Sequence, residues 1–181
     1  MTAGLVYTVD DDKALRRALA GLLSDANFEI IECESAEAFL QTKTRYESSC
    51  VLLDVKMGGI SGFDLQAQLS KREFSPPIIF LTGSASLPQA VNAMRSGASH
   101  FLTKPVNDQI LIDTISEAIE QSNDNALFFS FLQKLTSTEQ TIAKLVRQGL
   151  LTKQIATQLS LSLRTVEWHR KNIRAKGGLP Q

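Results

Sequence analysis

Asp54 is the residue whose sequence surroundings most clearly suggest chemistry. An apolar run from Val51 to Leu53 precedes it, and turn-forming residues from Gly58 to Gly62 follow. This order is typical of a buried parallel strand that presents a side chain at its carboxyl end, where functional groups gather in open α/β sheets. A cap for the next turn is the other interpretation of Asp54, because aspartate is common in turns.

Other polar side chains are predicted at the ends of further strands. They are Asp10 and Asp11 after strand 5–9, Thr82 after strand 78–81, and Lys104 after strand 99–102. Parallel strands end at one edge of a sheet, so we expect a single site. Carboxylates that repel one another can hold Mg²⁺, an ion that takes oxygen ligands. A bound ion would let Asp54 attack a phosphoryl group, while Thr82 and Lys104 bind the phosphoryl oxygens.

Single residues of this set also have simpler interpretations. Asp12 can cap the next helix, and capping explains one acid well but not three in succession. Lys104 alone would be an ordinary surface lysine in a Lys-Pro turn. Cys33 and Cys50 lack the spacing of a metal or redox motif, so we assign them no function.

The elements that must position these residues follow a regular pattern. Apolar runs predict strands at 5–9, 28–32, 50–54, 78–81 and 99–102. Helical spacing predicts helices at 14–23, 35–40, 63–69, 88–96 and 108–121. Because strands and helices alternate, we expect an α/β fold with a doubly wound parallel sheet of five strands.

The length of 181 residues suits one large domain or two small ones, and the two parts of the chain carry charges of opposite sign. Residues 1–135 contain 11 Lys and Arg against 17 Asp and Glu, a net charge of −6, whereas residues 136–181 contain 8 against 2, a net charge of +6. An acidic first part suits the binding of a cation such as a metal ion, and a basic last part suits the binding of a polyanion. We find neither a signal peptide nor an apolar run of about 20 residues, and expect a soluble cytoplasmic protein without membrane contact.

Residues 1–122 resemble the CheY-like receiver domain of bacterial two-component response regulators, which has a flavodoxin-like fold. The matching residues are Asp10, Asp11, Asp54, Thr82, Phe101, Lys104 and Pro105. The resemblance implies that Asp54 accepts a phosphoryl group with help from Thr82 and Lys104. The Mg²⁺ ligands that it implies are Asp10, Asp11, Asp54 and the backbone carbonyl of Lys56. Thr82 and Phe101 would be switch residues, although Phe101 also suits the edge of a core.

The loop after Asp54 departs from the pattern of this family. Family members usually have proline after the methionine of the loop, whereas Gly58 and Gly59 follow Met57 here. Glycine gives the backbone more freedom, so we expect a loop that is less preorganised but still supports phosphoryl chemistry.

Residues 123–135 form the junction between the two domains. Asn123, Asp124 and Asn125 interrupt the helical pattern, and the apolar cluster behind them is too rich for a free linker. The cluster consists of Leu127, Phe128, Phe129, Phe131, Leu132 and Leu135. We expect either a short helix that docks on the receiver, on the C-terminal domain or on a second chain, or the first core element of the next domain.

Residues 136–181 have the pattern of a small all-α domain with a helix-turn-helix. Ser137 or Thr138 is predicted to cap the first helix and Thr152 to cap the second, before a third helix at 163–176. The basic third helix can enter the major groove of DNA. A solvated helix face is the simpler interpretation of its charges, and the net charge of +6 favours phosphate contacts instead.

This domain resembles the LuxR-type helix-turn-helix of the NarL/FixJ response regulators. The matching residues are Gln154, Ile155, Ala156, Thr165, Val166, Glu167, His169 and Lys176. The resemblance implies that Glu167, Trp168 and Lys171 face base edges. The residues that it assigns to phosphates are Lys153, Arg164, Thr165, Arg170 and Arg174. The family has a fourth helix after Lys176, so we expect a shortened domain whose dimers rely on the receiver or on the cluster 128–135.

Together these resemblances imply a phosphorylation-dependent transcriptional regulator of a two-component system. A histidine kinase would phosphorylate Asp54, and the protein would then bind promoter DNA as a homodimer, with RNA polymerase as a further partner. It would be no enzyme beyond Mg²⁺-dependent phosphoryl transfer to its own Asp54 and hydrolysis of the product. The alternative is a phosphorylation-responsive interaction switch whose C-terminal domain no longer binds DNA productively. A phosphatase-like enzyme is a third interpretation, which lacks a second general acid.

Overall fold

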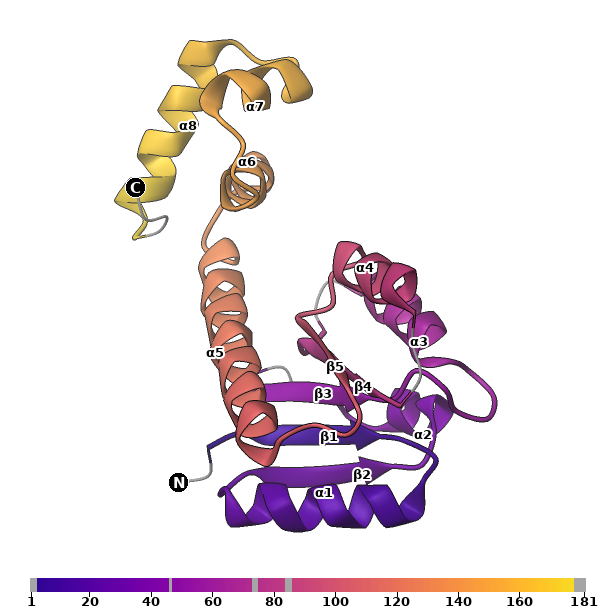
Figure 1. Cartoon of the computed structure of the whole chain (residues 1–181). Coiled ribbons are helices and arrows are strands. Elements are labelled where there is room, and N and C mark those ends of the chain that lie inside the picture. Colours follow the sequence, from indigo (N-terminus) through magenta and orange to yellow (C-terminus); the bar gives the residue numbers. More distant parts are fainter. Residues whose placement is uncertain (1–2, 46, 73–74, 84–85, 178–181) are drawn as a thin grey trace. The chain divides into compact units, whose positions relative to one another are not determined.

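The computed structural model describes residues 3–45, 47–72, 75–83 and 86–177, and the chain divides into two compact units, Met1–Asn125 and Ala126–Gln181 (Figure 1). The first unit contains a parallel sheet with the strand order β2-β1-β3-β4-β5. The strands are β1 (Leu5–Val9), β2 (Glu29–Cys33), β3 (Ser49–Leu53), β4 (Ile78–Thr82) and β5 (His100–Thr103). This order confirms the predicted doubly wound fold, with the strand order reversing between β1 and β3.

Helices cover both faces of the sheet, as the alternation of elements predicts. They are α1 (Lys13–Asp25), α2 (Ala36–Gln41), α3 (Gly62–Leu69), α4 (Leu87–Arg95) and α5 (Asp108–Leu132). Helices α1 and α5 share one core with the sheet, whereas α2, α3 and α4 share the other. Every residue of β1, β3 and β4 is buried, while the edge strands β2 and β5 are partly exposed. The sheet therefore fixes the strand ends that carry the polar residues.

Helix α5 differs from the prediction, because it does not end before Asn123 but continues to Leu132. The side-chain oxygen of Asn123 accepts hydrogen bonds from the backbone N–H of Ser48 at 2.8 Å and from its hydroxyl at 2.9 Å. The polar side chain of Asn123 thus binds the loop before β3, and the helix continues through this residue. Neither glycine nor proline occurs between Asp108 and Leu132 to stop the helix.

The second unit contains a helix-turn-helix. Its helices after α5 are α6 (Ser137–Arg147), α7 (Thr152–Leu159) and α8 (Leu163–Ala175). Leu132 and Leu135 belong to its core together with Ile142, Val166 and Ile173, and the phenylalanines of the apolar cluster pack against that core. Of the alternatives for this cluster, the structure therefore shows a core element of the second unit. Residues 178–181, on which the predicted shortening of the domain depends, lie outside the described residues.

The cap of α6 lies one residue earlier than expected, at Thr136 and not at Ser137 or Thr138. Glu139 Oε2 accepts the N–H of Thr136 at 2.9 Å, and the Thr136 hydroxyl accepts the N–H of Glu139 at 3.4 Å. These reciprocal bonds form a capping box, which needs the spacing of three residues that Thr136 provides.

The cap of α7 also differs from the prediction, because Leu151 and not Thr152 occupies the N-cap position. An aliphatic side chain cannot accept a hydrogen bond from the first turn, and only the Leu151 N–H is bound, by Gln154 Oε1 at 2.8 Å. After the left-handed residue Ser160, Ser162 caps α8. No helix within the described ranges is both long and apolar enough to cross a lipid bilayer.

Candidate functional site

Lys104 bridges two carboxylates at the carboxyl edge of the sheet. Its Nζ donates to Asp10 Oδ2 at 2.8 Å and to Asp54 Oδ1 at 3.0 Å. Asp10 follows β1 and Asp54 follows β3, two strands that pair in parallel, while Lys104 follows β5. The fold thus brings together three side chains that lie far apart in the sequence.

The charges of this cluster depend on one another. Only 8% of each carboxylate side chain is exposed, against 24% of Lys104. Burial alone would lower the pKa of Lys104, but its hydrogen bonds to Asp10 and Asp54, and then their charges, outweigh desolvation and raise the pKa above its ordinary value. Lys104 is therefore a cation at neutral pH and compensates two poorly solvated anions.

Backbone N–H groups of the loop that follows β3 bind two of the carboxylates. Asp54 Oδ2 accepts the N–H of Lys56 at 2.7 Å. Asp11, which is exposed, accepts the N–H of Gly58 on its Oδ2 at 3.1 Å. The loop after β1 and the loop after β3 are thereby joined beside the acid cluster.

Arg16 is a buried residue of α1 that the sequence interpretation missed. Its Nη1 donates to the backbone carbonyl of Asp10 at 2.6 Å, and its Nε lies 3.6 Å from Glu32 Oε2. Arg16 thus ties the end of β1 to the end of β2. It shares the helical spacing of the buried Leu19 and Leu23, so an arginine on the inward stripe was the signal that could have indicated it.

Thr82 and Phe101 lie on the two strands beside Lys104. Thr82 is buried at the end of β4, and its carbonyl accepts the N–H of Lys104 at 2.8 Å. Phe101 is half-buried on β5, and its ring packs on Phe80 with centroids 5.6 Å apart. The strand pair therefore connects both predicted switch residues to the position of Lys104.

The potential metal ligands of the cluster are the carboxylates of Asp10, Asp11 and Asp54 and the carbonyl of Lys56. They suit a hard divalent cation, because all of them are oxygens. Among the described residues, however, no three acidic, histidine or cysteine side chains are grouped closely enough to hold a metal ion. Lys104 instead bridges two of the acids. The residues fit Mg²⁺ by their chemistry, with a lysine ammonium as the compensating charge in this structure.

The predicted DNA contacts on α8 fall largely on its exposed side, opposite the buried Val166 and Ile173. The exposed members of the set on α8 are Arg164, Glu167, Trp168, Lys171 and Arg174, and Lys153 on α7 is exposed as well. Trp168 is 59% exposed, an unusual state for so large an apolar side chain. Thr165 and His169 are half-buried, as is Arg170, whose Nη1 donates to the Thr152 hydroxyl at 2.9 Å.

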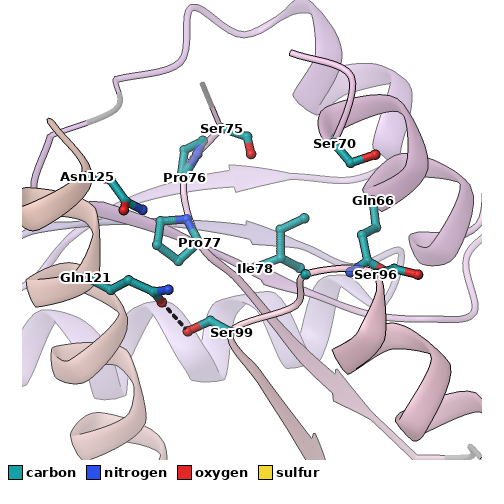
Figure 2. A pocket seen from close by; sticks show the side chains of 11 residues that line it. Gln66, Ser70, Ser75, Pro76, Pro77, Ile78, Ser96, Ser99, Gln121 and Asn125 are labelled. Carbon is teal, nitrogen blue, oxygen red and sulfur yellow. Dashed lines mark hydrogen bonds between the residues drawn. The ribbon is translucent and has the colours of Figure 1, made fainter. Parts of the chain in front are cut away.

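A separate hollow of about 150 Å³ lies at the opposite edge of the sheet, where β4 and β5 begin (Figure 2). Amides and hydroxyls line it, among them Gln66, Ser70 and Ser96. The Ser99 hydroxyl donates to Gln121 Oε1 at 2.7 Å across its rim. None of the described side chains that line it is charged, so this hollow lacks the chemistry of the acid cluster.

A doubly wound sheet with an acid–lysine cluster at its carboxyl edge, followed by a helix-turn-helix, defines the class of response regulators with a DNA-binding output domain. Residues 6–116 match the family of the response regulator receiver domain. Residues 133–179 match the bacterial regulatory proteins of the luxR family. The chain belongs to the response regulators that combine a receiver domain with a LuxR-type DNA-binding domain.

Several relatives share this arrangement along nearly the whole chain. Nodulation protein W of Bradyrhizobium diazoefficiens is 36% identical over 97% of this chain and 80% of its own length. The response regulator protein TodT of Pseudomonas putida is 37% identical over 96% of this chain and 80% of its own length. The crystal structure of full-length FixJ from B. japonicum is 34% identical, has a TM-score of 0.64, and covers 97% of this chain and 90% of that chain. Membership of the family implies a histidine kinase partner and DNA binding by a regulator.

Proposed function

We propose that Asp54 accepts a phosphoryl group from a histidine kinase and that this modification controls the binding of promoter DNA by the second unit. The observation that carries the proposal is the bridge from Lys104 to Asp10 and Asp54 at the carboxyl edge of the sheet. A carboxylate oxygen of Asp54 attacks phosphorus, and the bond from phosphorus to the donor nitrogen breaks. The product is an acyl phosphate, which water hydrolyses to restore Asp54.

The residues around Asp54 have separate tasks in this reaction. The N–H of Lys56 fixes the carboxylate by binding its Oδ2. Lys104 keeps its charge when the acid reacts, so its ammonium group can bind a phosphoryl oxygen, as can the Thr82 hydroxyl. Asp10, Asp11, Asp54 and the Lys56 carbonyl would hold Mg²⁺, which would supply positive charge between the Asp54 carboxylate and the phosphoryl group, two anions that otherwise repel each other.

The output of the protein is the second part of the proposal. Glu167, Trp168 and Lys171 contact base edges, and Lys153, Arg164, Thr165, Arg170 and Arg174 contact phosphates. The exposed basic side of α8 and the net charge of +6 over residues 136–181 support this assignment. The site of action is the cytoplasm, where the bound promoter DNA is accessible to RNA polymerase.

Phosphorylation also promotes homodimerisation in this proposal. Helix α4 supports it, because its Leu87, Val91 and Met94 are apolar, exposed by 78%, 40% and 44%, and spaced so that they share one side of the helix. Exposed apolar side chains that gather on one helix face favour a protein contact. The same surface also suits the alternative function, an interaction switch that does not bind DNA productively.

Labelling with acetyl phosphate tests the phospho-acceptor. In the presence of MgCl₂ we expect one labelled site that is lost in Asp54→Asn and kept in Asp25→Asn, which changes an exposed aspartate at the end of α1. Labelling that is unchanged in Asp54→Asn would refute the proposal. Salt-dependent DNA binding by the same preparation separates the transcriptional regulator from the interaction switch.

A further inference from the structure

We infer that the backbone N–H of Gly58 positions Asp11 for a divalent cation, a role that the family's usual proline cannot fill. The inference rests on the proposed function, because it concerns the same acid cluster. Gly58 is a positioning residue in this sense, since it acts through Asp11 and not on the reacting atoms.

The hydrogen bond from Gly58 to Asp11 Oδ2, at 3.1 Å, joins residues 47 positions apart in the sequence. Asp11 is exposed, so its carboxylate would otherwise move among several rotamers. The bond occupies one oxygen and leaves Oδ1 available for a cation. Proline has no N–H and could not make this bond.

The bond matters because ligands that are themselves hydrogen-bonded bind metals better. Loss of such a supporting group typically lowers metal affinity by roughly 10–100-fold. In this chain the donor is a main-chain group, whose position is set by the loop and not by a side-chain rotamer.

The conformational freedom of glycine does not explain the residue at position 58. Its φ lies outside the left-handed region, and a Cβ added to Gly58 would meet nothing within 4 Å. Gly59, in contrast, has a φ of 88°, and its Cβ would lie 2.7 Å from Glu37 Oε1. Glu37 Oε1 also accepts the N–H of Ile60 at 3.0 Å. The loop is thus held at two points despite its two glycines.

The open space around Gly58 permits a matched pair of variants at this position. Gly58→Ala keeps the N–H and places its methyl group in open space, whereas Gly58→Pro removes the N–H. Both substitutions reduce backbone freedom, proline more than alanine, and only Gly58→Pro removes the hydrogen bond to Asp11.

The test is a calorimetric titration of the full chain with MgCl₂. We expect Gly58→Pro to weaken Mg²⁺ binding about 10-fold and Gly58→Ala to stay within about twofold of the unchanged protein. Equal affinity in Gly58→Pro, or equal weakening in both variants, would overturn the inference. Circular dichroism establishes that both variants fold.

A second readout does not depend on the proline variant. The amide proton resonance of Gly58 should move upfield in Asp11→Ala, because its acceptor is lost, and an unmoved resonance would overturn the inference. The proposed function would be refuted by different results, namely no Mg²⁺ binding by the unchanged protein or undiminished labelling in Asp54→Asn. Mg²⁺ binding that is tight and equal in all Gly58 variants would refute the positioning role alone.

Discussion

Lys104 allows two carboxylates to remain nearly buried at the same edge of the sheet. Its two hydrogen bonds, at 2.8 and 3.0 Å, replace water as the partner of Asp10 and Asp54. An anion left in such a place without a partner bears a large desolvation penalty. The lysine therefore contributes to the stability of the first unit as well as to the proposed chemistry.

Replacing Lys104 by methionine keeps much of the aliphatic chain and removes the charge. We expect Lys104→Met to lower the free energy of unfolding of the Mg²⁺-free protein by about 2 kcal/mol, because each acid loses a charged donor. Urea unfolding measures this change, with Lys56→Met as the control, since the side chain of Lys56 is exposed. The interpretation would be wrong if both variants lost the same stability. Added MgCl₂ should restore part of the loss in Lys104→Met.

The convergence of Asp10, Asp54 and Lys104 could be expected from sequence, because parallel strands place their carboxyl ends at one edge. Arg16 could not, since inward positions on an amphipathic helix are assigned to apolar residues and its acceptor is a backbone carbonyl. The bond between Gly58 and Asp11 was equally hidden. It depends on how two loops approach each other, and spacing along the chain carries no such information.

At the scale of elements, an ion pair between a buried glutamate and an exposed lysine connects the start of α6 to the C-cap of α8. Lys176 Nζ lies 2.6 Å from Glu139 Oε2, and only 4% of the Glu139 side chain is exposed. The hydrogen bond from Lys176, followed by that from the Thr136 backbone, lowers the pKa of Glu139 to about 2. One carboxylate thus serves both a helix cap and a contact between helices.

This shift in pKa predicts how the stability of the second unit depends on pH. The folded pKa of Glu139 is depressed, so its contribution is fully present above pH 4.5, the ordinary value, and is lost as pH falls toward about 2. Urea unfolding followed by the fluorescence of Trp168, the single tryptophan, measures this loss between pH 5 and 2. Glu139→Gln should be less stable at pH 7 by about 2 kcal/mol and should flatten the dependence.

The control for Glu139 is Glu167→Gln on the exposed side of α8, which should keep the pH dependence of the unchanged protein. If Glu139→Gln retained the same acid sensitivity, another group would be responsible.

Leu151 at the start of α7 offers a gain in stability. It is 70% exposed and occupies an N-cap position without a side-chain acceptor. We expect Leu151→Ser to raise the free energy of unfolding of the second unit by about 1 kcal/mol, because serine can accept an N–H of the first turn. Thermal unfolding measures the gain. Leu163→Ser, which changes an exposed leucine inside the first turn of α8, should give no such increase.

Elements that depend on local patterns were predictable, and those that depend on distant contacts were less so. Central strands such as β1 and β4 were found from their apolar runs, because burial on both faces leaves continuous apolar sequence. The end of α5 was missed because Asn123 is locally a weak helix former, yet it bonds to Ser48, 75 residues earlier. Tertiary hydrogen bonds of this kind override local propensity.

At the scale of the whole molecule, the charges are separated along the chain, with −6 over residues 1–135 and +6 over residues 136–181. The basic part should make DNA binding strongly dependent on salt, because bound phosphates release counterions. Arg174→Ala should reduce the slope of log affinity against log salt by about 1. Gel-shift titrations at several salt concentrations measure the slope. Lys43→Ala, at an exposed lysine of the first unit, should leave the slope unchanged.

Dimerisation, which phosphorylation is proposed to cause, would link the modification of Asp54 to DNA binding. Beryllofluoride mimics a phosphoryl group on Asp54, so with MgCl₂ it should double the mass of the protein in sedimentation. Val91→Asp should prevent this doubling, because it places a charge within the exposed apolar stripe of α4. Leu127→Asp, at a leucine of the second unit that is 70% exposed, should permit the doubling.

Doubling of the mass in Val91→Asp would exclude α4 from the dimer interface. A constant mass in the unchanged protein would mean that phosphorylation acts within one chain, and DNA titrations of that monomer would then test the interaction switch directly.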